Sequence, residues 1–241
     1  MITRFYNGPL KGHLLQLQNE IVQCKACPRL VEYRERKALT EKRAGFSNWD
    51  YWGAPVPSHG DQNAKLLIVG LAPGAHGANR TGRVFTGDRS GDFLFEALYR
   101  AGLANQPVSR SRDDGLRLNF TYVTAIVRCA PPANRPTATE RSACRPWLEA
   151  ELDLLTDLRV VVALGGEAWR QMVHVYRDRG DYCGRRIPVF GHGEEISAGS
   201  HTMIGSYHPS QQNTFTGRLT PDMLDSVLIR ASEIACIKPR E

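Results

Sequence analysis

Apolar residues gather in four short runs along the chain. Each run is continuous, rich in Val, Ile, Leu or Thr, and bounded by Gly, Pro, Asn or charged residues. Short continuous runs between such boundaries are typical of strands that are buried on both faces. The four predicted strands are 65–71, 120–127, 159–164 and 202–206.

Between and after these runs, apolar residues recur at helical spacing. Thr220 and Pro221 are well placed to cap and begin the last helix. Strands that alternate with helices form a parallel sheet with helices on both faces, so the pattern predicts a three-layer α/β/α fold. The predicted helices are 91–101, 139–156, 166–176 and 221–235.

The first 63 residues do not follow this alternation. Leu14, Leu17 and Ile21 predict a short amphipathic helix over 10–23, and 40–63 is predicted to be a long, ordered, irregular segment. We find no internal repeat. The chain is therefore expected to be one domain, 1–241, with an N-terminal segment (1–63) added to an α/β/α core (64–241).

Charge and hydropathy narrow the partners. The chain of 241 residues carries a formal net charge of +6, and most of its cations are arginines. Arginine suits phosphate recognition, so a polyanionic partner is one interpretation and a solubilising surface is the other. No apolar run approaches the ~18 residues of a membrane span. Arg4, Lys11 and His13 interrupt the N-terminus, so we expect no signal peptide and a cytoplasmic protein.

The end of the first predicted strand carries the strongest sign of a ligand site. Gly70, Gly74, Gly77 and Gly82 follow the apolar run 66–71, and glycines let a backbone approach a ligand closely. Open α/β sheets bind ligands beyond the carboxyl ends of their strands. The spacing is neither that of a Walker A loop nor that of a dinucleotide fingerprint. We therefore expect a ligand other than a nucleotide cofactor.

Four cysteines have spacings that suggest a shared site. Cys24 and Cys27 form a Cys-x-x-Cys pair, Cys129 ends the second predicted strand, and Cys144 lies in a predicted helix. Stable disulfides are rare in the cytoplasm. Four thiolates could hold either zinc or an iron–sulfur cluster, and spacing alone does not choose between them.

Four segments, taken together and in this order, resemble the uracil-DNA glycosylase superfamily. They are the four cysteines, Gly70-Leu-Ala-Pro-Gly74 continuing to Gly87-Asp88, Val127-Arg-Cys-Ala-Pro-Pro132, and Tyr207-His-Pro-Ser-Gln-Gln-Asn213. The pattern is most similar to family 5, the type-B enzymes of bacteria and archaea. The likeness runs from about Cys24 to the final helix.

The resemblance implies a four-stranded, mainly parallel sheet and a [4Fe–4S] cluster on Cys24, Cys27, Cys129 and Cys144. It also implies hydrolysis of the N-glycosidic bond of a damaged base in double-stranded DNA, which leaves an abasic site. A monomer suffices for such an enzyme. Two alternatives stay open: a nucleic-acid-binding module without catalysis, and a uracil-only enzyme like those of family 4.

The same resemblance suggests three catalytic residues. His208 would donate a hydrogen bond to the departing base, and Asp88 would orient or deprotonate the attacking water. Asn134 is a second candidate for positioning that water. Asp88 could instead cap the helix that begins near Ser90, and Asn134 could be a turn residue.

Two alanines depart from the wider superfamily. Ala72 stands where other families carry a carboxylate or amide, and Ala125 stands where an asparagine commonly reads the edge of uracil. A pocket without that amide should accept several bases, so we expect action on hypoxanthine as well as uracil, with Phe85 stacking on the extruded base. The expected substrate-binding residues are Gly70, Ala72, Pro73, Gly74, His76, Asn79, Phe85 and Ala125.

The remaining expected contacts are with DNA. Arginines near the glycine-rich loop and after the last predicted strand would grip phosphates. The polar loop after His208 would enter the minor groove and fill the gap left by the extruded base. The expected DNA-binding residues are Arg80, Arg83, Gln211, Gln212, Asn213 and Arg218.

Overall fold

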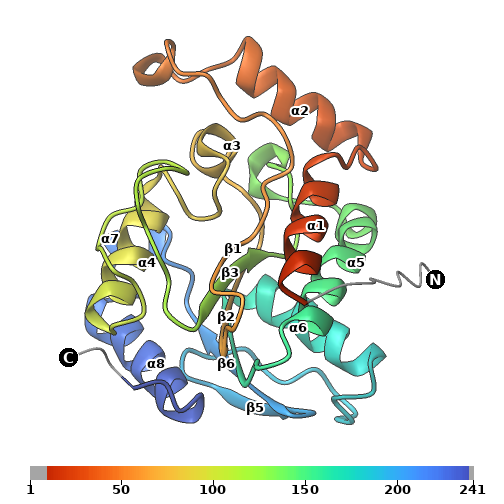
Figure 1. Ribbon diagram of the computed structural model, residues 1–241, viewed down its shortest axis with the longest axis vertical. Coiled ribbons are helices and arrows are strands. Elements are labelled where there is room, and N and C mark those ends of the chain that lie inside the picture. The colour runs from red at the N-terminus through yellow and green to blue at the C-terminus, as the bar shows by residue number, and fades with distance from the viewer. Residues whose placement is uncertain (1–9, 239–241) are drawn as a thin grey trace.

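A six-stranded sheet forms the centre of the computed structural model, which describes residues 10–238 (Figure 1). The strand order is β1-β3-β2-β4-β6-β5. Four neighbouring strands are parallel, as predicted: β3 (Thr121–Ala125), β2 (Leu66–Gly70), β4 (Val160–Leu164) and β6 (His201–Ser206).

Two short antiparallel strands extend this sheet at its edges. β1 (His59–Gly60) pairs with β3, and β5 (Glu195–Ala198) pairs with β6. Neither strand was predicted, because β1 has two residues and β5 is largely exposed, so neither forms an apolar run. The prediction of a four-stranded, mainly parallel sheet is confirmed for the centre of the sheet.

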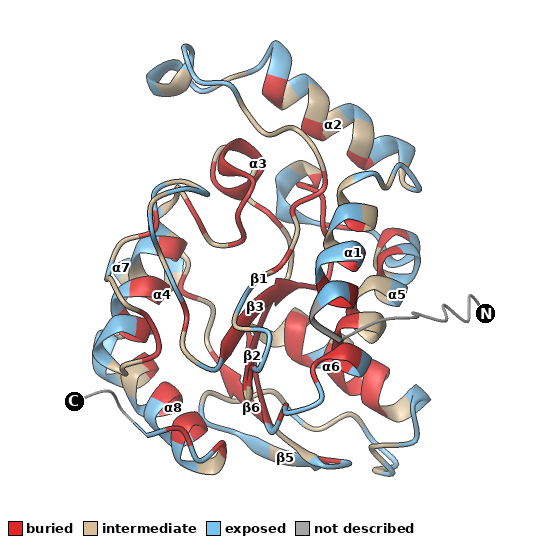
Figure 2. Cartoon of the chain, viewed as in Figure 1, coloured by how far each residue is buried: buried red, intermediate tan, exposed pale blue. Residues whose placement is uncertain are grey.

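Helices cover both faces of the sheet. Within β2, Leu66 and Ile68 face one hydrophobic cluster, and Leu67 and Val69 face the other. This alternation explains why the strands are continuous apolar runs. Figure 2 shows buried residues on the strands and on the helix surfaces that turn toward them. The first cluster packs under α4 (Arg89–Arg100) and α8 (Pro221–Ile234), and the second under α1 (Leu10–Val22), α5 (Ala138–Leu154) and α6 (Gly166–Asp178).

Side-chain caps fix where the core helices begin. Thr137 and Glu140 form a reciprocal capping box at α5, and Thr220 caps α8 ahead of Pro221. Asp88 caps α4 by accepting a hydrogen bond from the Gly91 backbone N–H. In the described part of the chain, every helix is too short or too polar to cross a membrane.

The N-terminal segment contains a helix that the sequence pattern did not predict. α2 (Pro28–Leu39) lies across the end of the molecule above α3 (Ala78–Thr81) (Figure 1). Its buried residues are few (Leu30, Arg34 and Ala38), and most of its other positions are charged. The sequence therefore has no apolar stripe from which this helix could be predicted. The following residues are largely irregular, as expected, apart from β1 and the short helix η1 (Ala44–Phe46).

A buried polar network joins this segment to the sheet. The Arg128 guanidinium forms an ion pair with Glu151 of α5 at 2.5 Å, and both side chains are almost fully buried. Arg128 also donates to Ser58, and Glu151 accepts from Thr124 of β3 (2.8 Å). Gln18 of α1 donates to Glu151 (3.2 Å). Ser58, Thr124 and Gln18 thus hydrogen-bond to the Arg128–Glu151 ion pair, and these contacts fix the position of α1 and α5 against β3.

Candidate active site

A pocket of about 320 Å³ opens at the carboxyl ends of β2, β3 and β6. This is the edge at which parallel sheets place their ligands. Six of the eight predicted substrate-binding residues line it, together with Asp88, Asn134 and His208. Those six are Gly70, Ala72, Pro73, Gly74, Phe85 and Ala125.

Phe85 forms an aromatic wall of the pocket in a constrained backbone conformation. Its φ is 54°, which is uncommon for a bulky residue and is often found at functional sites. A Cβ on Gly70 would lie 2.7 Å from the Phe85 ring, and a Cβ on Gly91 would lie 1.8 Å from its carbonyl oxygen. Both glycines are therefore needed for Phe85 to occupy this position. Its ring centre is 5.9 Å from that of His208.

Asp88 caps α4 and also lines the pocket. One carboxylate oxygen, Oδ1, caps α4 through Gly91 N–H at 3.1 Å. The other, Oδ2, lies in a notch beside Gly74 and Gly77, where a Cβ on Gly77 would be only 2.1 Å from it. Burial raises the pKa of Asp88, and hydrogen bonds from the Gly91 and Ser90 backbones partly oppose that rise. The helix cap thus holds a carboxylate at the mouth of the pocket.

His208 lies in the loop after β6, against Phe85 on the pocket wall. Gly165 (φ 93°) allows the close approach of the His208 Cβ, 3.3 Å from where a Cβ on Gly165 would lie. Burial lowers the pKa of His208 to about 4. The imidazole is therefore neutral at pH 7, and in that form it can donate one hydrogen bond to a ligand.

Asn134 overhangs the pocket from the short helix η2 (Pro132–Asn134). Asn134 and Ala133 both have positive φ, 55° and 52°. Two consecutive non-glycine residues in this conformation are costly, and such strain persists where the surrounding structure enforces it. The Asn134 side chain is exposed and forms no hydrogen bond within the described residues, so its amide is free to meet a ligand.

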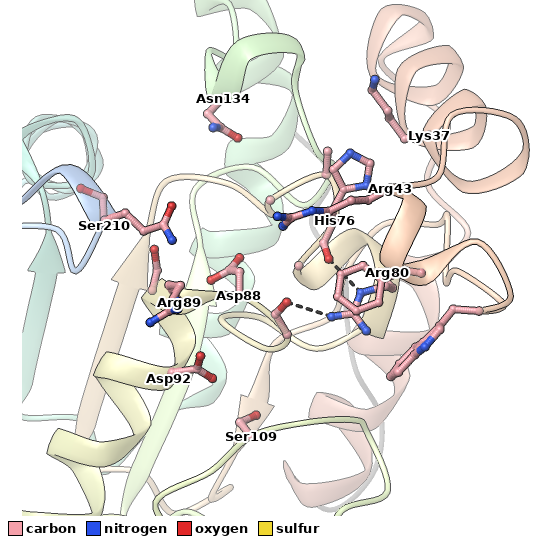
Figure 3. A pocket seen from close by; sticks show the side chains of 18 of the residues that line it. Lys37, Arg43, His76, Arg80, Asp88, Arg89, Asp92, Ser109, Asn134 and Ser210 are labelled. Atoms are coloured by element: carbon pink, nitrogen blue, oxygen red, sulfur yellow. Dashed lines mark hydrogen bonds between the residues drawn. The ribbon is translucent and has the colours of Figure 1, made fainter. Parts of the chain in front are cut away.

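A larger cleft of about 960 Å³ leads into the pocket (Figure 3). The two cavities share Gly74, Asp88, Asn134 and Ser210. The predicted residues His76, Gln211 and Gln212 line the cleft. His76 interacts with Tyr51 through its ring nitrogen Nδ1, at 3.1 Å from the Tyr51 hydroxyl.

Cations line this cleft on several sides. Arg43, Arg89 and Arg110 come from three different segments, and within the described chain none of them forms an ion pair. Lys37 of α2 also lines it and pairs with Glu41 (2.6 Å). These four were not among the predicted DNA-binding residues. One side of the cleft is formed by residues between 33 and 49. The sequence signal that could have identified it is the interleaving of cations with aromatic residues in that range.

Three predicted contact residues are buried, although one of them, Arg80, lines the cleft. Asn79 is fully buried and donates to the Arg34 backbone carbonyl (3.2 Å), so its amide does not reach the substrate. Arg83 is 6% exposed and pairs with Asp114 at 2.6 Å, so the prediction that it grips a phosphate is wrong. Arg80 is only 4% exposed, and its guanidinium is engaged by protein groups.

The loop after His208 contains a short helix, α7 (Gln211–Phe215). Asn213 does not extend from it: its side-chain amide donates to the His208 carbonyl at 2.8 Å. It therefore braces the loop that carries His208. The Arg218 guanidinium lies 4.6 Å from the centre of the Tyr207 ring, a cation–π contact, on the exposed side of the same loop.

The four predicted ligand cysteines line one small cavity between α2 and α5. All four are free thiols, and Cys129 and Cys144 are buried. Arg34 donates to the Cys129 sulfur (2.8 Å), and the Arg128 backbone N–H donates to the Cys144 sulfur (3.3 Å). Among residues 10–238, no group of three or more His, Cys, Asp or Glu side chains is arranged to hold a metal ion.

Comparison with known proteins agrees with this fold and pocket. A profile of the Uracil DNA glycosylase superfamily matches residues 57–231, and the chain belongs to that superfamily. It is 53% identical over 230 residues to a Type-5 uracil-DNA glycosylase of Mycobacterium tuberculosis, covering 94% of this chain and 84% of the relative.

Proteins of two other organisms are also similar to this chain. A Type-5 uracil-DNA glycosylase of Thermus thermophilus is 48% identical over 217 residues, covering 89% of this chain and 95% of the relative. A Type-4 uracil-DNA glycosylase of Thermotoga maritima is 30% identical over 158 residues, covering 64% of this chain and 69% of the relative. The similarity to type-5 proteins thus spans more of the chain and is higher.

Proposed function

We propose that this protein is a monofunctional uracil-DNA glycosylase that hydrolyses the bond between uracil and deoxyribose and leaves an abasic site. Relatives named Type-5 uracil-DNA glycosylase, about half identical over most of the chain, support this activity. The observation that carries it is the small pocket with Phe85, His208 and Asp88 on its walls, at the base of a cleft lined by unpaired arginines.

The departing base is stabilised inside the pocket. Phe85 stacks on the extruded base, and the neutral His208 imidazole donates to a base carbonyl. As the glycosidic C–N bond breaks, its electron pair leaves with the base, so negative charge builds on that carbonyl. A donor aimed at developing charge in a water-poor site contributes about 3 kcal/mol to the rate.

Water attacks the sugar from the side of Asp88. A bond forms between the water oxygen and C1′ as positive charge develops on the sugar ring, and the water proton passes to the Asp88 carboxylate or to solvent. The departing base anion then takes up a proton. The free amide of Asn134, at the junction of pocket and cleft, helps to position this water.

The DNA partner is a duplex, bound by a monomer. A base must leave the helix to enter a pocket of this depth, and extrusion costs least at mispaired or damaged bases. The cleft arginines Arg43, Arg89 and Arg110 contact phosphates, while Gln211 and Gln212 approach the minor groove. Because phosphate contacts carry no sequence information, binding is independent of sequence and sensitive to salt.

The substrate range extends to hypoxanthine, since no amide reads the base edge at the end of β3. Ala125 occupies that place on the pocket wall and is 1% exposed. We expect Ala125→Asn to lower cleavage of hypoxanthine more than cleavage of uracil. A matched Ala72→Asn variant, in the loop after β2, tests whether an amide added elsewhere on the pocket wall has the same effect. A wild-type preference for uracil by several orders of magnitude would contradict the broad range.

The four cysteines lining the cavity beside α2 would hold a [4Fe–4S] cluster. Two features support this: all four are reduced and line one cavity, and N–H groups of Arg34 and Arg128 donate to two of the sulfurs. Such donors are typical around iron–sulfur clusters. The cluster would cross-link the start of α2 to the residues that follow β3, and Ala133 and Asn134 among these residues line the cleft. It would take no part in the bond cleavage.

The activity is tested with purified protein and end-labelled duplexes that contain one uracil or one hypoxanthine, followed by hot alkali to cut abasic sites. Cutting at both bases supports the proposal in full. Cutting at uracil alone supports an enzyme of narrower range, like those of family 4. Binding to the duplexes without cutting would instead favour the nucleic-acid-binding module.

A further inference from the structure

Arg80 lines the cleft, and its guanidinium is held by both hydrogen bonds and aromatic rings. Its Nε donates to the His76 carbonyl and its Nη2 to the Gly87 carbonyl, both at 2.8 Å. The guanidinium carbon lies 3.8 Å from the ring centre of Phe46 and 4.3 Å from that of Trp49. One buried cation thus fastens together the glycine-rich loop, the turn before α4 and the N-terminal segment.

The turn before α4 is shaped around this guanidinium. Gly87 has φ 87°, and a Cβ there would lie 2.6 Å from the Arg80 Nη2. Gly87 is bonded directly to Asp88, so the position of its carbonyl sets the position of the Asp88 backbone. On the other side, the notch at Gly74 and Gly77 receives the Asp88 side chain. Arg80 therefore positions the Asp88 backbone through its hydrogen bond to the Gly87 carbonyl, and the close approach of Gly74 and Gly77 positions the Asp88 carboxylate.

We propose that Arg80 is a positioning residue, which holds the Gly87–Asp88 turn in register with the pocket by clamping it to the aromatic residues Phe46 and Trp49. This inference rests on the proposed function, because it takes Asp88 as the residue that handles the water. It also replaces the expectation that Arg80 grips a DNA phosphate, since its Nε and Nη2 donate to protein carbonyls and two aromatic rings contact its guanidinium.

The clamp has an electrostatic consequence. The charge of Arg80 lowers the pKa of Asp88, whereas burial and the neighbouring Asp92 raise it. The other titratable or charged groups lining the cleft or pocket include Lys37, Arg43, His76, Arg89, Arg110 and His208. The pKa of His76 is lowered by burial and by the charges of Lys37, Arg43 and Arg80, so a substitution at position 80 should raise it as well. Loss of the Arg80 charge should therefore make Asp88 protonate at a higher pH.

The test compares Arg80→Gln and Arg80→Lys in single-turnover cleavage of a uracil-containing duplex across pH, with enzyme in excess. For Arg80→Gln we expect a rate loss on the order of 100-fold from misplacement of Asp88, and an acid limb moved to higher pH. Arg80→Lys keeps the charge but loses the planar clamp, so its acid limb should stay near the wild-type position while its rate stays low.

Two further variants keep the inference falsifiable. Phe46→Leu removes one aromatic contact of the guanidinium while Arg80 stays, and should lower the rate; it also serves if Arg80→Gln does not fold. Arg89→Gln removes an exposed cation of the same cleft, and should weaken DNA binding and its salt dependence without moving the acid limb.

Three results would overturn the inference. One is an Arg80→Gln protein that cleaves at the wild-type rate at every pH. Another is an Arg80→Gln protein that loses affinity and salt dependence as Arg89→Gln does, which would make Arg80 a phosphate contact after all. The third is a wild-type rate for Phe46→Leu together with an unfolded Arg80→Gln. If the wild-type protein itself does not cleave uracil, the proposed function is overturned. This outcome is distinguished from the other three because it is measured on the wild-type protein alone.

Discussion

Burial keeps the His208 imidazole in its neutral form. Its pKa is lowered to about 4, so its protonation state does not change between roughly pH 5 and 8. We expect His208→Ala to reduce the single-turnover rate by about 100-fold to 1000-fold, the typical loss for one donor to a developing oxyanion. The loss should be the same at each pH in this range.

His208→Gln is the matched control, because an amide can still donate a hydrogen bond. It should recover part of the rate and bind DNA as the wild-type protein does. A rate loss that grows steadily with pH between 5 and 8 would contradict a donor that is neutral throughout.

At the residue scale, the sequence identified what faces the pocket better than it identified the charged contacts. Gly70 and His208 were predicted because they lie at or just after strand ends, and Phe85 and Asp88 because they lie in a segment that resembles a family. Arg83 was placed on the surface because arginine is seldom buried, and nothing local in the sequence reveals its distant partner Asp114. Such pairs depend on tertiary contacts between segments far apart in the chain.

Helix α4 shares its N-cap with the proposed chemistry, and the two contributions of Asp88 can be separated. Asp88→Ser keeps a good capping residue, whereas Asp88→Ala removes the cap at a cost of about 1 kcal/mol in the free energy of unfolding. Both variants lack the carboxylate and should lose most of the cleavage activity. Urea unfolding and single-turnover cleavage measure the two effects. Full activity in Asp88→Ser would show that the carboxylate only caps the helix.

Helix α2 allows a test of the proposed cluster. Arg34 is buried and donates to the Cys129 sulfur (2.8 Å), whereas Arg36, on the same helix, is exposed and pairs with Glu32 and Glu41. We expect Arg34→Met to lose iron and visible absorbance during purification in air, and Arg36→Met to keep both. Equal iron content in the two variants would show that the Arg34 hydrogen bond does not protect the cluster.

At the element scale, the strands and long helices of the core were predictable, because each buries a continuous or periodic apolar surface. α2 and α7 were missed for opposite reasons. Half of the residues of α2 are charged, and Arg34 holds the helix in place; α7 has only five residues, and its Asn and Thr are weak helix formers. The edge strands depend on pairing with β3 and β6 and have no pattern of their own.

At the scale of the whole molecule, part of the chain's positive charge lines the cleft. Arg43, Arg89 and Arg110 line it without ion pairs in the described chain. Each arginine replaced by glutamine should reduce the slope of log affinity against log salt by about 0.9, as expected for one lost phosphate contact. Fluorescence anisotropy with an undamaged duplex measures this slope.

Arg117 provides the control for that experiment. It is exposed and lies outside the cleft, so Arg117→Gln removes the same charge without removing a proposed contact. An equal change of slope in Arg117→Gln would show that net charge alone drives binding and that the cleft has no special role.

The order in which the chain is made differs from the order in which it can be completed. α1 packs on α5, and Arg34 of α2 reaches Cys129, so these helices dock onto partners that are synthesised about a hundred residues later. Until α5 has emerged, α1 has no surface on which to bury Leu17 and Ile21, and Cys24 and Cys27 stand apart from the other two thiols. α1 and α2 can thus be packed in place only after α5 has been made, and iron delivered before that point would meet only half of the proposed ligands.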